Sequence, residues 1–246
     1  DIVTLNYRFE WGDVNFMRAL AFTSAAICVE VPPVPDDEAR AFLRECRKAC
    51  DEGGAVFILD EVVTGFRLAL GGAAAKYDIK PDIACYGKAM SATGGVSAIV
   101  GRSDLVDLLA NEVFYSTTFG GSPGPCAVAA ATVKWLKENR WSVYGQRSWD
   151  AYLGADVIQQ GHLNYIGQML IDGYNELGIK CLGQPERSIF SFPSDSEWLD
   201  FCSKMIGQGV MCHRPNFVSL SHSMDDVSKT IECAERVLKN VRGFDG

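Results

Sequence analysis

Residues Ala55–Gly101, AVFILDEVVTGFRLALGGAAAKYDIKPDIACYGKAMSATGGVSAIVG, contain the pattern from which the fold can be inferred. The first five are apolar without alternation, which is typical of a strand buried on both faces of a parallel sheet under helices. That strand ends at Asp60 and Glu61, and a second apolar run, Ile83–Tyr86, is followed after one glycine by Lys88. Because open α/β sheets place ligands at the carboxyl ends of their strands, we expect the aspartate and the lysine at one edge of one sheet.

Asp60 and Lys88 together have a chemical meaning. A partly desolvated lysine can act as an amine nucleophile toward an aldehyde. A carboxylate opposite it can keep a pyridinium nitrogen protonated and so strengthen the ring as an electron sink. The pair therefore describes a pyridoxal-phosphate site. An aspartate after an apolar strand and a Gly-Lys dipeptide are each common, however, so these two residues alone favour a surface lysine and an ordinary turn.

Four motifs strengthen the first interpretation: DEVVTGFR, YDIKPDIACYGKAMSATGG, SAIVGR and STTFGGSPGPCAVAAA. In order and spacing they resemble the class III (fold type I) pyridoxal-phosphate aminotransferases, and the Thr-Gly-Phe-Arg form resembles the glutamate-1-semialdehyde 2,1-aminomutase branch. The resemblance implies an α/β fold: part of a large domain with a mixed, mostly parallel sheet under helices, then a small α+β C-terminal domain.

The resemblance also assigns roles to five residues. Lys88 would carry the internal aldimine and move the substrate proton, and Asp60 would bind the pyridinium nitrogen. Val62 would pack against the ring, and Val63 would lie near the ring hydroxyl. Thr118 would reach a cofactor phosphate, in the family that of the neighbouring subunit, which implies a homodimer. The implied substrates are small amines or amino acids and keto or aldehyde compounds.

A nucleotide-hydrolase interpretation can be rejected. Four apolar residues before Asp60 and Glu61 also resemble a Walker B strand, but such enzymes need the phosphate loop G-x-x-x-x-G-K followed by Ser or Thr. Before Lys88 the first glycine is replaced by Asp82, and after it Ala89 replaces the hydroxyl residue. The phosphate loop is therefore missing from this motif.

Composition limits the remaining classes. The 246 residues are 48% hydrophobic and 22% charged, as in an ordinary globular protein. A net charge of −8 gives no basic footprint for nucleic acid, and no apolar run approaches the ~20 residues of a membrane span. The nine cysteines are odd in number and scattered. Cys46 and Cys50 are four apart, a helical spacing that could face one metal, but no Cys-x-x-Cys and no nearby histidine completes a site, and the three histidines form no ligand spacing. We expect reduced thiols, no metal and a cytoplasmic location, since no secretory signal is visible.

Two domains are predicted. Residues 1–160 would be the C-terminal part of the cofactor-binding large domain, with an unusual aromatic-rich insertion at 139–156. Residues 161–246 would be a linking helix and the small domain, whose short strands would lie at Ser188–Phe192 and around Gly209–Cys212. A helix from about Pro125 to Glu138 would follow the glycine-rich turn.

The first residue is Asp1, and the family's Gly/Ser/Thr-rich phosphate turn and ring-stacking aromatic lie upstream of the motifs found here. We therefore expect the chain to be the C-terminal part of such an enzyme. Two hypotheses remain open. The chain belongs to a transaminase or aminomutase that works through Lys88, or it is a truncated, non-catalytic chain that needs its missing N-terminal half to bind the cofactor.

Overall fold

The computed structural model describes residues 5–93, 95–114, 116–117, 120–150 and 155–242. The chain forms two compact units, one of Asp1–Pro32 with Asp36–Glu138, the other of Pro33–Pro35 with Asn139–Gly246. The domain boundary at residue 160 stays a prediction. Within the described part of the chain, every helix is too short or too polar to cross a membrane.

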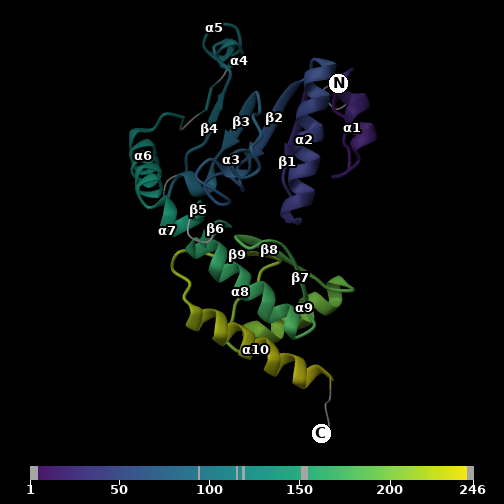
Figure 1. The fold of residues 1–246 in the computed structure, drawn as a ribbon, viewed down its shortest axis with the longest axis vertical. Helices are drawn as coiled ribbons and strands as arrows, with labels where there is room; N and C mark the ends of the chain where they lie inside the picture. Colours follow the sequence, from purple (N-terminus) through teal and green to yellow (C-terminus); the bar gives the residue numbers. More distant parts are fainter. Residues whose placement is uncertain (1–4, 94, 115, 118–119, 151–154, 243–246) are drawn as a thin grey trace. The chain divides into compact units, whose positions relative to one another are not determined.

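The first unit is built on a four-stranded sheet in the order β1-β2-β3-β4 (Figure 1). Its strands are β1 (Ala26–Glu30), β2 (Val56–Glu61), β3 (Ile83–Tyr86) and β4 (Ala98–Gly101). The first three are parallel and β4 is antiparallel to β3. The sheet is therefore mixed and mostly parallel, as predicted.

Helices α1 (Val14–Ala21), α2 (Asp36–Gly53) and α3 (Gly72–Tyr77) contact this sheet or one another. Three acidic residues open α2, where the helix dipole favours negative charge. Its buried residues recur at helical spacing: Ala39, Phe42, Leu43, Cys46, Ala49 and Cys50. The guanidinium of Arg47 lies 5.4 Å from the centre of the Phe57 ring, so α2 covers the face of β2 to which Phe57 belongs.

The two faces of β2 differ, contrary to the expectation of burial on both. Phe57, Leu59 and Glu61 are fully buried, whereas the alternate residues, including Ile58 and Asp60, are half-buried. The neighbouring Cys28, which pairs with Ile58, is exposed. An apolar run indicates that a strand is hydrophobic on both faces. Which face is buried depends on where the covering helices lie.

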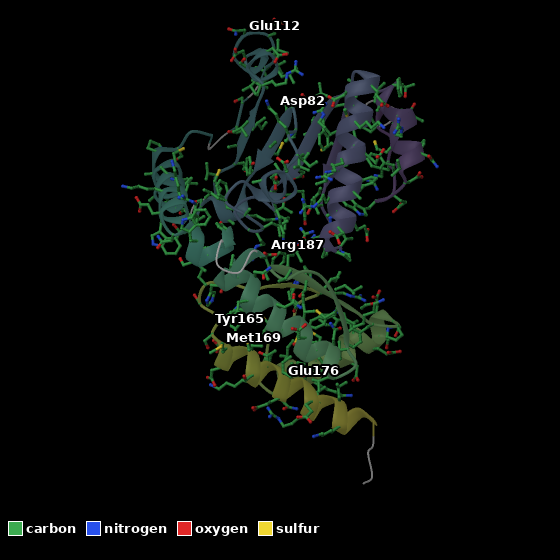
Figure 2. All side chains as sticks on the ribbon, viewed as in Figure 1. Asp82, Glu112, Tyr165, Met169, Glu176 and Arg187 are labelled. Carbon is green, nitrogen blue, oxygen red and sulfur yellow. The ribbon has the colours of Figure 1, made fainter. Side chains whose placement is uncertain are left out.

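The rest of the first unit follows Lys88. It contains the 3₁₀ turn η2 (Lys88–Met90), the short helices α4 (Ser103–Val106) and α5 (Leu108–Asn111), and α6 (Pro123–Glu138), which contacts η2. Asp82, labelled in Figure 2, precedes β3 and accepts hydrogen bonds from Arg47, Arg102 and the Phe57 N–H. This carboxylate joins the starts of β2 and β3 to α2 and to the end of β4.

The second unit begins within the segment predicted as an insertion. Helix α7 (Arg140–Tyr144) leads into the antiparallel hairpin of β5 (Gly145–Asp150) and β6 (Ala155–Gln160). Trp141 is half-exposed, and the Arg140 guanidinium lies 4.3 Å from the centre of its ring. Residues 151–154 of this segment lie outside the described residues.

A three-stranded antiparallel sheet and three helices follow: α8 (His162–Glu176), β7 (Lys180–Gln184), β8 (Arg187–Ser191), α9 (Asp195–Gly207), β9 (Pro215–Phe217) and α10 (Met224–Arg242). The strand expected around Gly209–Cys212 is wrong, since β9 lies three residues further on. The apolar pair Val210 and Cys212 packs into the core without pairing in the sheet.

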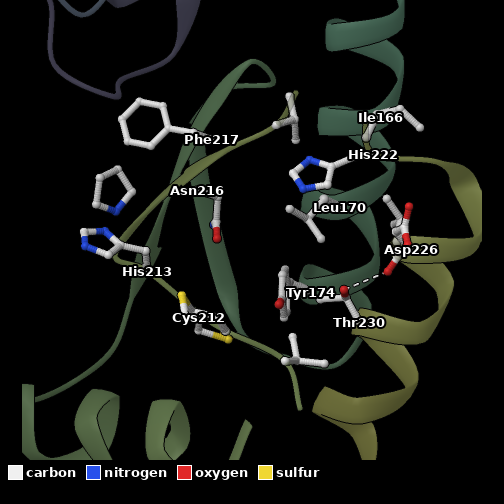
Figure 3. Close-up of a pocket in the computed structure, with 15 residues that line it drawn as sticks. Ile166, Leu170, Tyr174, Cys212, His213, Asn216, Phe217, His222, Asp226 and Thr230 are labelled. Atoms are coloured by element: carbon white, nitrogen blue, oxygen red, sulfur yellow. Dashed lines mark hydrogen bonds between the residues drawn. The ribbon is translucent and has the colours of Figure 1, made fainter. Parts of the chain in front are cut away.

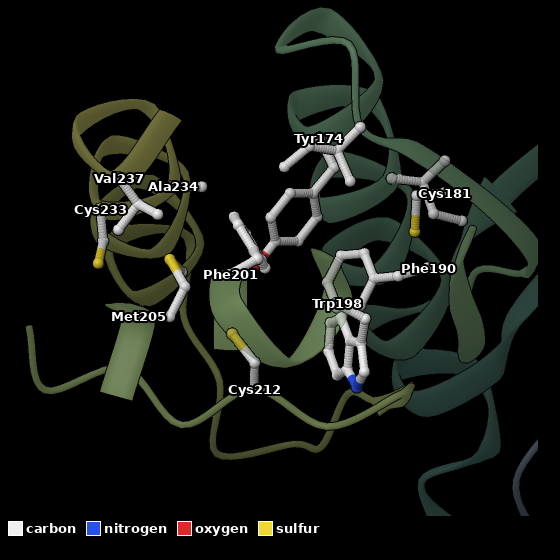
Figure 4. Packing of buried hydrophobic residues seen from close by; sticks show 12 residues of the cluster. Tyr174, Cys181, Phe190, Trp198, Phe201, Met205, Cys212, Cys233, Ala234 and Val237 are labelled. Carbon is white, nitrogen blue, oxygen red and sulfur yellow. The ribbon is translucent and has the colours of Figure 1, made fainter. Parts of the chain in front are cut away.

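The core of the second unit surrounds Phe190, which is 1% exposed (Figure 4). Its ring centre lies 4.6 Å from that of Tyr174 in an edge-on arrangement and 5.2 Å from that of Trp198. Phe201 and Met205 of α9 and Ala234 and Val237 of α10 complete the cluster. Such aromatic pairs contribute about 0.5–1.5 kcal/mol each beyond the area they bury.

Candidate active site

Asp60 lies at the carboxyl end of β2, where it pairs with Glu30 of β1 and Cys85 of β3. Its carboxylate oxygen Oδ1 accepts a hydrogen bond from the Val62 N–H at 2.9 Å. Among the described residues, no hydrogen bond to the second oxygen, Oδ2, is found. The side chain is thus fixed by one oxygen, and the other is available to accept a hydrogen bond from a ligand.

Lys88 follows β3 and is exposed at the start of η2. Because Asp60 pairs with Cys85, three residues before Lys88, the strand register brings both residues to the same edge of the sheet. The backbone of Lys88 has φ +42°, which is uncommon for a residue other than glycine. Strained backbone of this kind clusters at functional sites, because only a well-determined surrounding maintains it.

Gly87 separates the strand from the lysine. A Cβ atom at this position would lie 3.6 Å from the Val62 Cγ1 atom and 3.6 Å from the Ser97 Oγ atom. Val62 is therefore next to the backbone that carries Lys88, while Val63 is half-buried in the turn that follows. The structure thus brings Asp60, Val62 and the Lys88 backbone together.

The turn after β2 explains the Thr-Gly-Phe-Arg motif. A Cβ atom at Gly65 would lie 2.4 Å from the Tyr86 ring, so only glycine fits against the end of β3. Phe66 has φ +57°, and its ring centre lies 5.5 Å from that of Tyr86. Gly65, which packs closely against Tyr86, is thus followed directly by the left-handed Phe66 at the carboxyl edge of the sheet.

Glu61 lies on the opposite face from Asp60, and the sequence alone assigned it no role. Its carboxylate is fully buried and accepts hydrogen bonds from the Thr64 hydroxyl and from the Ala73 and Ala74 N–H groups. Burial raises the pKa of Glu61, although these three hydrogen bonds act in the other direction. The one sequence signal for this arrangement is the strand alternation, which places adjacent carboxylates on opposite faces.

Thr118 lies outside the described residues, so its predicted phosphate contact stays a prediction. The adjoining turn forms part of the wall of a cavity of about 500 Å³. The cavity is lined by Ser116, Thr117, Gly120 and Gly121 of the turn together with Ser97, Ile99 and Leu109. Gly121 has φ +72°, a left-handed conformation, and α6 begins two residues later. A glycine- and hydroxyl-rich turn before a helix is suited to bind an anion such as a phosphate group.

The second unit contains a separate cavity of about 250 Å³ between α8, α10 and the segment that includes β9 (Figure 3). Ile166, Leu170 and Tyr174 of α8 form one wall, and His213 and His222 contribute polar groups. The Nδ1 atom of His222 accepts a hydrogen bond from the Ser219 N–H at 3.0 Å. The sequence did not predict this cavity, because its residues come from three separate segments.

The residues at the sheet edge fit pyridoxal phosphate. Lys88 offers an exposed amine, Asp60 offers a carboxylate oxygen with capacity to accept, and Val62 with Gly87 offers an apolar surface. Electron-sink cofactors need these three kinds of group: an amine for the aldehyde, an anion for the ring nitrogen and a wall for the ring face.

Solved structures share this architecture. The FumI protein of a Sphingopyxis species, whose structure is a PLP internal aldimine form, superimposes with a TM-score of 0.77 over 96% of this chain and 57% of its own, at 24% identity. The ornithine aminotransferase of Toxoplasma gondii gives a TM-score of 0.75 over 96% of this chain and 56% of its own, at 22% identity. The chain therefore has the fold type I aminotransferase fold.

Sequence comparison identifies the family. Residues 35–221 match the model of the family described as aminotransferase class-III, and the chain belongs to that family. A glutamate-1-semialdehyde 2,1-aminomutase of Thermomicrobium roseum is 31% identical over 225 residues, which are 86% of this chain and 50% of the relative. The chain thus spans half the length of that relative. The resemblance inferred from the four motifs is confirmed at the level of family and fold.

Proposed function

We propose that this chain carries the lysine and aspartate of a pyridoxal-phosphate-dependent aminotransferase site. One observation carries the proposal: Asp60, at the carboxyl end of β2, and Lys88, just after the adjacent parallel β3, lie at the same edge of the sheet, with Val62 beside the backbone of the lysine. An amine and a carboxylate in this register can contact opposite ends of one flat ring, the amine at the aldehyde and the carboxylate at the ring nitrogen.

Bound pyridoxal phosphate supplies an aldehyde for amine chemistry and a pyridinium ring that accepts an electron pair. Asp60 would hold the protonated ring nitrogen through Oδ2. Lys88 would supply the Nζ amine for the aldehyde and would take the proton from the substrate carbon. Val62 would close one face of the ring, Val63 would lie near the ring hydroxyl, and Thr118 would contact a phosphate of the neighbouring subunit in a homodimer.

The proposed activity is closest to that of the glutamate-1-semialdehyde 2,1-aminomutases. Support comes from the Thr-Gly-Phe-Arg motif and from the 31% identity to the Thermomicrobium roseum enzyme. The substrates would be small amino compounds together with keto acids or aldehydes. An amino acid semialdehyde contains an amine and an aldehyde and so combines both classes in one molecule.

The first test locates the reactive lysine. Purified chain with added pyridoxal phosphate is reduced with borohydride, and the labelled peptide is identified by mass. We expect label on Lys88 and loss of at least about 90% of it in Lys88→Ala, because only an amine at that position meets the aldehyde. Lys80→Ala, a change at an exposed lysine on the loop before β3, is the matched control and should retain the label. Label that persists in Lys88→Ala places the reactive amine elsewhere.

The second test concerns Asp60. In Asp60→Asn the label on Lys88 should form, while amino-group transfer should slow by about 100- to 1,000-fold, as when a fixed electrostatic partner of a transition state is removed. Single-turnover absorbance of the cofactor measures this rate. Unchanged turnover would remove Asp60 from the proposed role.

A second candidate function is a chain that binds the cofactor only together with further polypeptide. The observation in its favour is the exposed Cys28 on the face of the sheet that carries Asp60, in a chain that spans half of its aminomutase relative. If the isolated chain shows no label and the polypeptide encoded by the complete reading frame shows label on Lys88, this candidate is the correct one.

A further inference from the structure

We propose that Glu61 is a positioning residue of this site: its buried carboxylate fixes the turn between β2 and α3 and thereby holds Asp60 and Val62 in the orientation that the cofactor ring needs. The effect on cofactor binding rests on the proposed function. The effect of Glu61 on the protein itself can be tested without cofactor.

The contacts of Glu61 come from both ends of the turn. Oε2 accepts hydrogen bonds from the Thr64 hydroxyl and, at 2.9 Å, from the Ala73 N–H, while Oε1 accepts from the Ala74 N–H at 2.7 Å. The main-chain oxygen of Glu61 accepts from the Gly65 N–H at 2.8 Å. One residue thus joins the end of a strand, the turn that follows it and the start of α3.

The backbone of the turn leaves room for this carboxylate. A Cβ atom at Gly72 would lie 2.2 Å from Oε2 of Glu61, so the carboxylate occupies the space that any other residue's side chain would fill. Gly72 has φ +67° and Phe66 has φ +57°. Glycine adopts a positive φ without strain, whereas the left-handed Phe66 persists only when its surroundings over-determine it, and the buried carboxylate supplies hydrogen bonds at both ends of this segment.

The connection to the site is one residue long. Glu61 is flanked by Asp60 and Val62, and the Val62 N–H donates to Oδ1 of Asp60 at 2.9 Å. Because adjacent strand residues point to opposite faces, rotation of the Glu61 peptide moves Asp60 and Val62 at the same time. The hydrogen bonds of Glu61 to α3 and the turn therefore set the direction in which the Asp60 carboxylate points.

A merely structural carboxylate is available in the same unit for comparison. Asp82 is 8% exposed and accepts hydrogen bonds from two arginines and the Phe57 N–H, at the amino end of the strands. If Glu61 acted only on stability, Glu61→Gln and Asp82→Asn would have the same consequences at the sheet edge that carries Lys88. The proposal predicts that they differ.

The first arm measures hydrogen exchange of the protein without cofactor. In Glu61→Gln one acceptor oxygen becomes an amide donor facing N–H groups, so exchange at Ala73 and Ala74 should accelerate by at least about 10-fold. The decisive amide is that of Val62, on the ligand side, which should accelerate by a similar factor. In Asp82→Asn the Val62 amide should show the same local exchange as in the wild type once the change in the global free energy of unfolding is subtracted. A Val62 amide that is unchanged in Glu61→Gln overturns the proposal.

The second arm measures the dissociation constant of pyridoxal phosphate by absorbance titration. We expect a rise of about 10-fold in Glu61→Gln and less than about 2-fold in Asp82→Asn, since only the first disturbs the direction of Asp60. Wild-type chain without label on Lys88 contradicts cofactor binding by this chain alone, and hydrogen exchange then decides on Glu61. Wild-type chain with label, and equal affinity in folded Glu61→Gln, contradicts the role of Glu61 alone.

Two further variants keep the test decisive if Glu61→Gln fails to fold. Thr64→Val removes one donor to Oε2 and keeps the side-chain volume, and Gly72→Ala displaces the carboxylate without changing its charge. Both should accelerate exchange at Val62. If both variants fold with wild-type exchange there, Glu61 does not position Asp60.

Discussion

At the scale of single residues, the stability of the first unit depends on Asp82. Its carboxylate accepts from Arg47 at 2.9 Å, from Arg102 at 3.1 Å and from the Phe57 N–H at 2.8 Å. Burial by itself would raise the pKa of Asp82, but the hydrogen bonds from Phe57, Arg47 and Arg102 outweigh it and hold the pKa below the ordinary value of 3.8. The folded state therefore favours the ionised form.

We expect Asp82→Asn to lower the free energy of unfolding at pH 7 by about 1–3 kcal/mol, because it removes the charge-assisted hydrogen bonds from Arg47 and Arg102, although these arginines keep Asp51 and Asp104 as second partners. A lowered folded-state pKa stabilises the protein at pH values above the unfolded pKa, and this contribution is lost as the pH falls through the folded value. The difference between wild type and variant should accordingly shrink below about pH 4. Urea unfolding at pH 7 and at about pH 3.5 measures it.

Asp104→Asn is the matched control, because Asp104 pairs with Arg102 at the exposed surface. Exposed ion pairs contribute little, so its unfolding curve should follow that of the wild type at both pH values. An equal loss in the two variants would show that Arg102, and not the buried carboxylate, carries the effect.

The residues of the site were predictable to different degrees. Asp60 and Lys88 follow apolar runs, and their motifs have fixed spacing, so the sequence placed them at strand ends. Glu61 could not be singled out, because its partners Ala73 and Ala74 are small apolar residues whose contribution is a backbone N–H. Likewise, nothing in the sequence distinguishes the left-handed backbone of Lys88, which depends on the contacts of the whole turn.

At the scale of elements, close backbone packing distinguishes two helical glycines of the second unit, Gly167 and Gly207. Gly167 of α8 lies against the turn between β7 and β8, where a Cβ atom would meet the Pro185 carbonyl oxygen at 1.8 Å. Gly207, the last residue of α9, has open space around it. A Cβ atom would therefore clash with backbone at Gly167 and fit without a clash at Gly207.

Gly→Ala in a helix ordinarily stabilises by about 1 kcal/mol. We expect Gly167→Ala instead to destabilise by about 1–3 kcal/mol, because the backbone of the β7–β8 turn must move. Gly207→Ala should leave stability unchanged or raise it by up to about 1 kcal/mol. Thermal or urea unfolding of the two variants provides the comparison, and a stabilised Gly167→Ala would show that α8 does not contact the turn as described.

Helices were predicted from sequence more closely than short strands. The helix predicted from about Pro125 to Glu138 agrees with α6 to within two residues at its start, since a long helical pattern repeats many times. The strand β9, of three residues, was placed several positions too early. A run that short has no measurable period, and its pairing depends on β8, a strand far earlier in the chain.

At the scale of the whole chain, two units have separate cores, and each contains buried thiols that can report on its unfolding. Burial raises the pKa of Cys46 in the first unit to about 12 and that of Cys212 in the second unit to about 12. At about pH 8 such a thiol is ionised to about one part in ten thousand, whereas an unfolded cysteine with a pKa of about 8.5 is ionised to roughly a quarter. Alkylation at this pH therefore marks the unit that has unfolded.

We propose that the two units are separate folding domains, and pulse alkylation with iodoacetamide over a urea series tests this. Cys126, which is exposed, should react at every urea concentration and serves as the internal control. Cys46 and Cys212 should become reactive at different urea concentrations, because Cys212 belongs to a core cluster of second-unit residues and a separate domain can open while the other remains closed. Peptide mass measures the labelled fraction of each. Coincident transitions would instead describe one cooperative unit. In that case a change such as Gly167→Ala would also lower the midpoint at Cys46; independent domains confine its effect to Cys212.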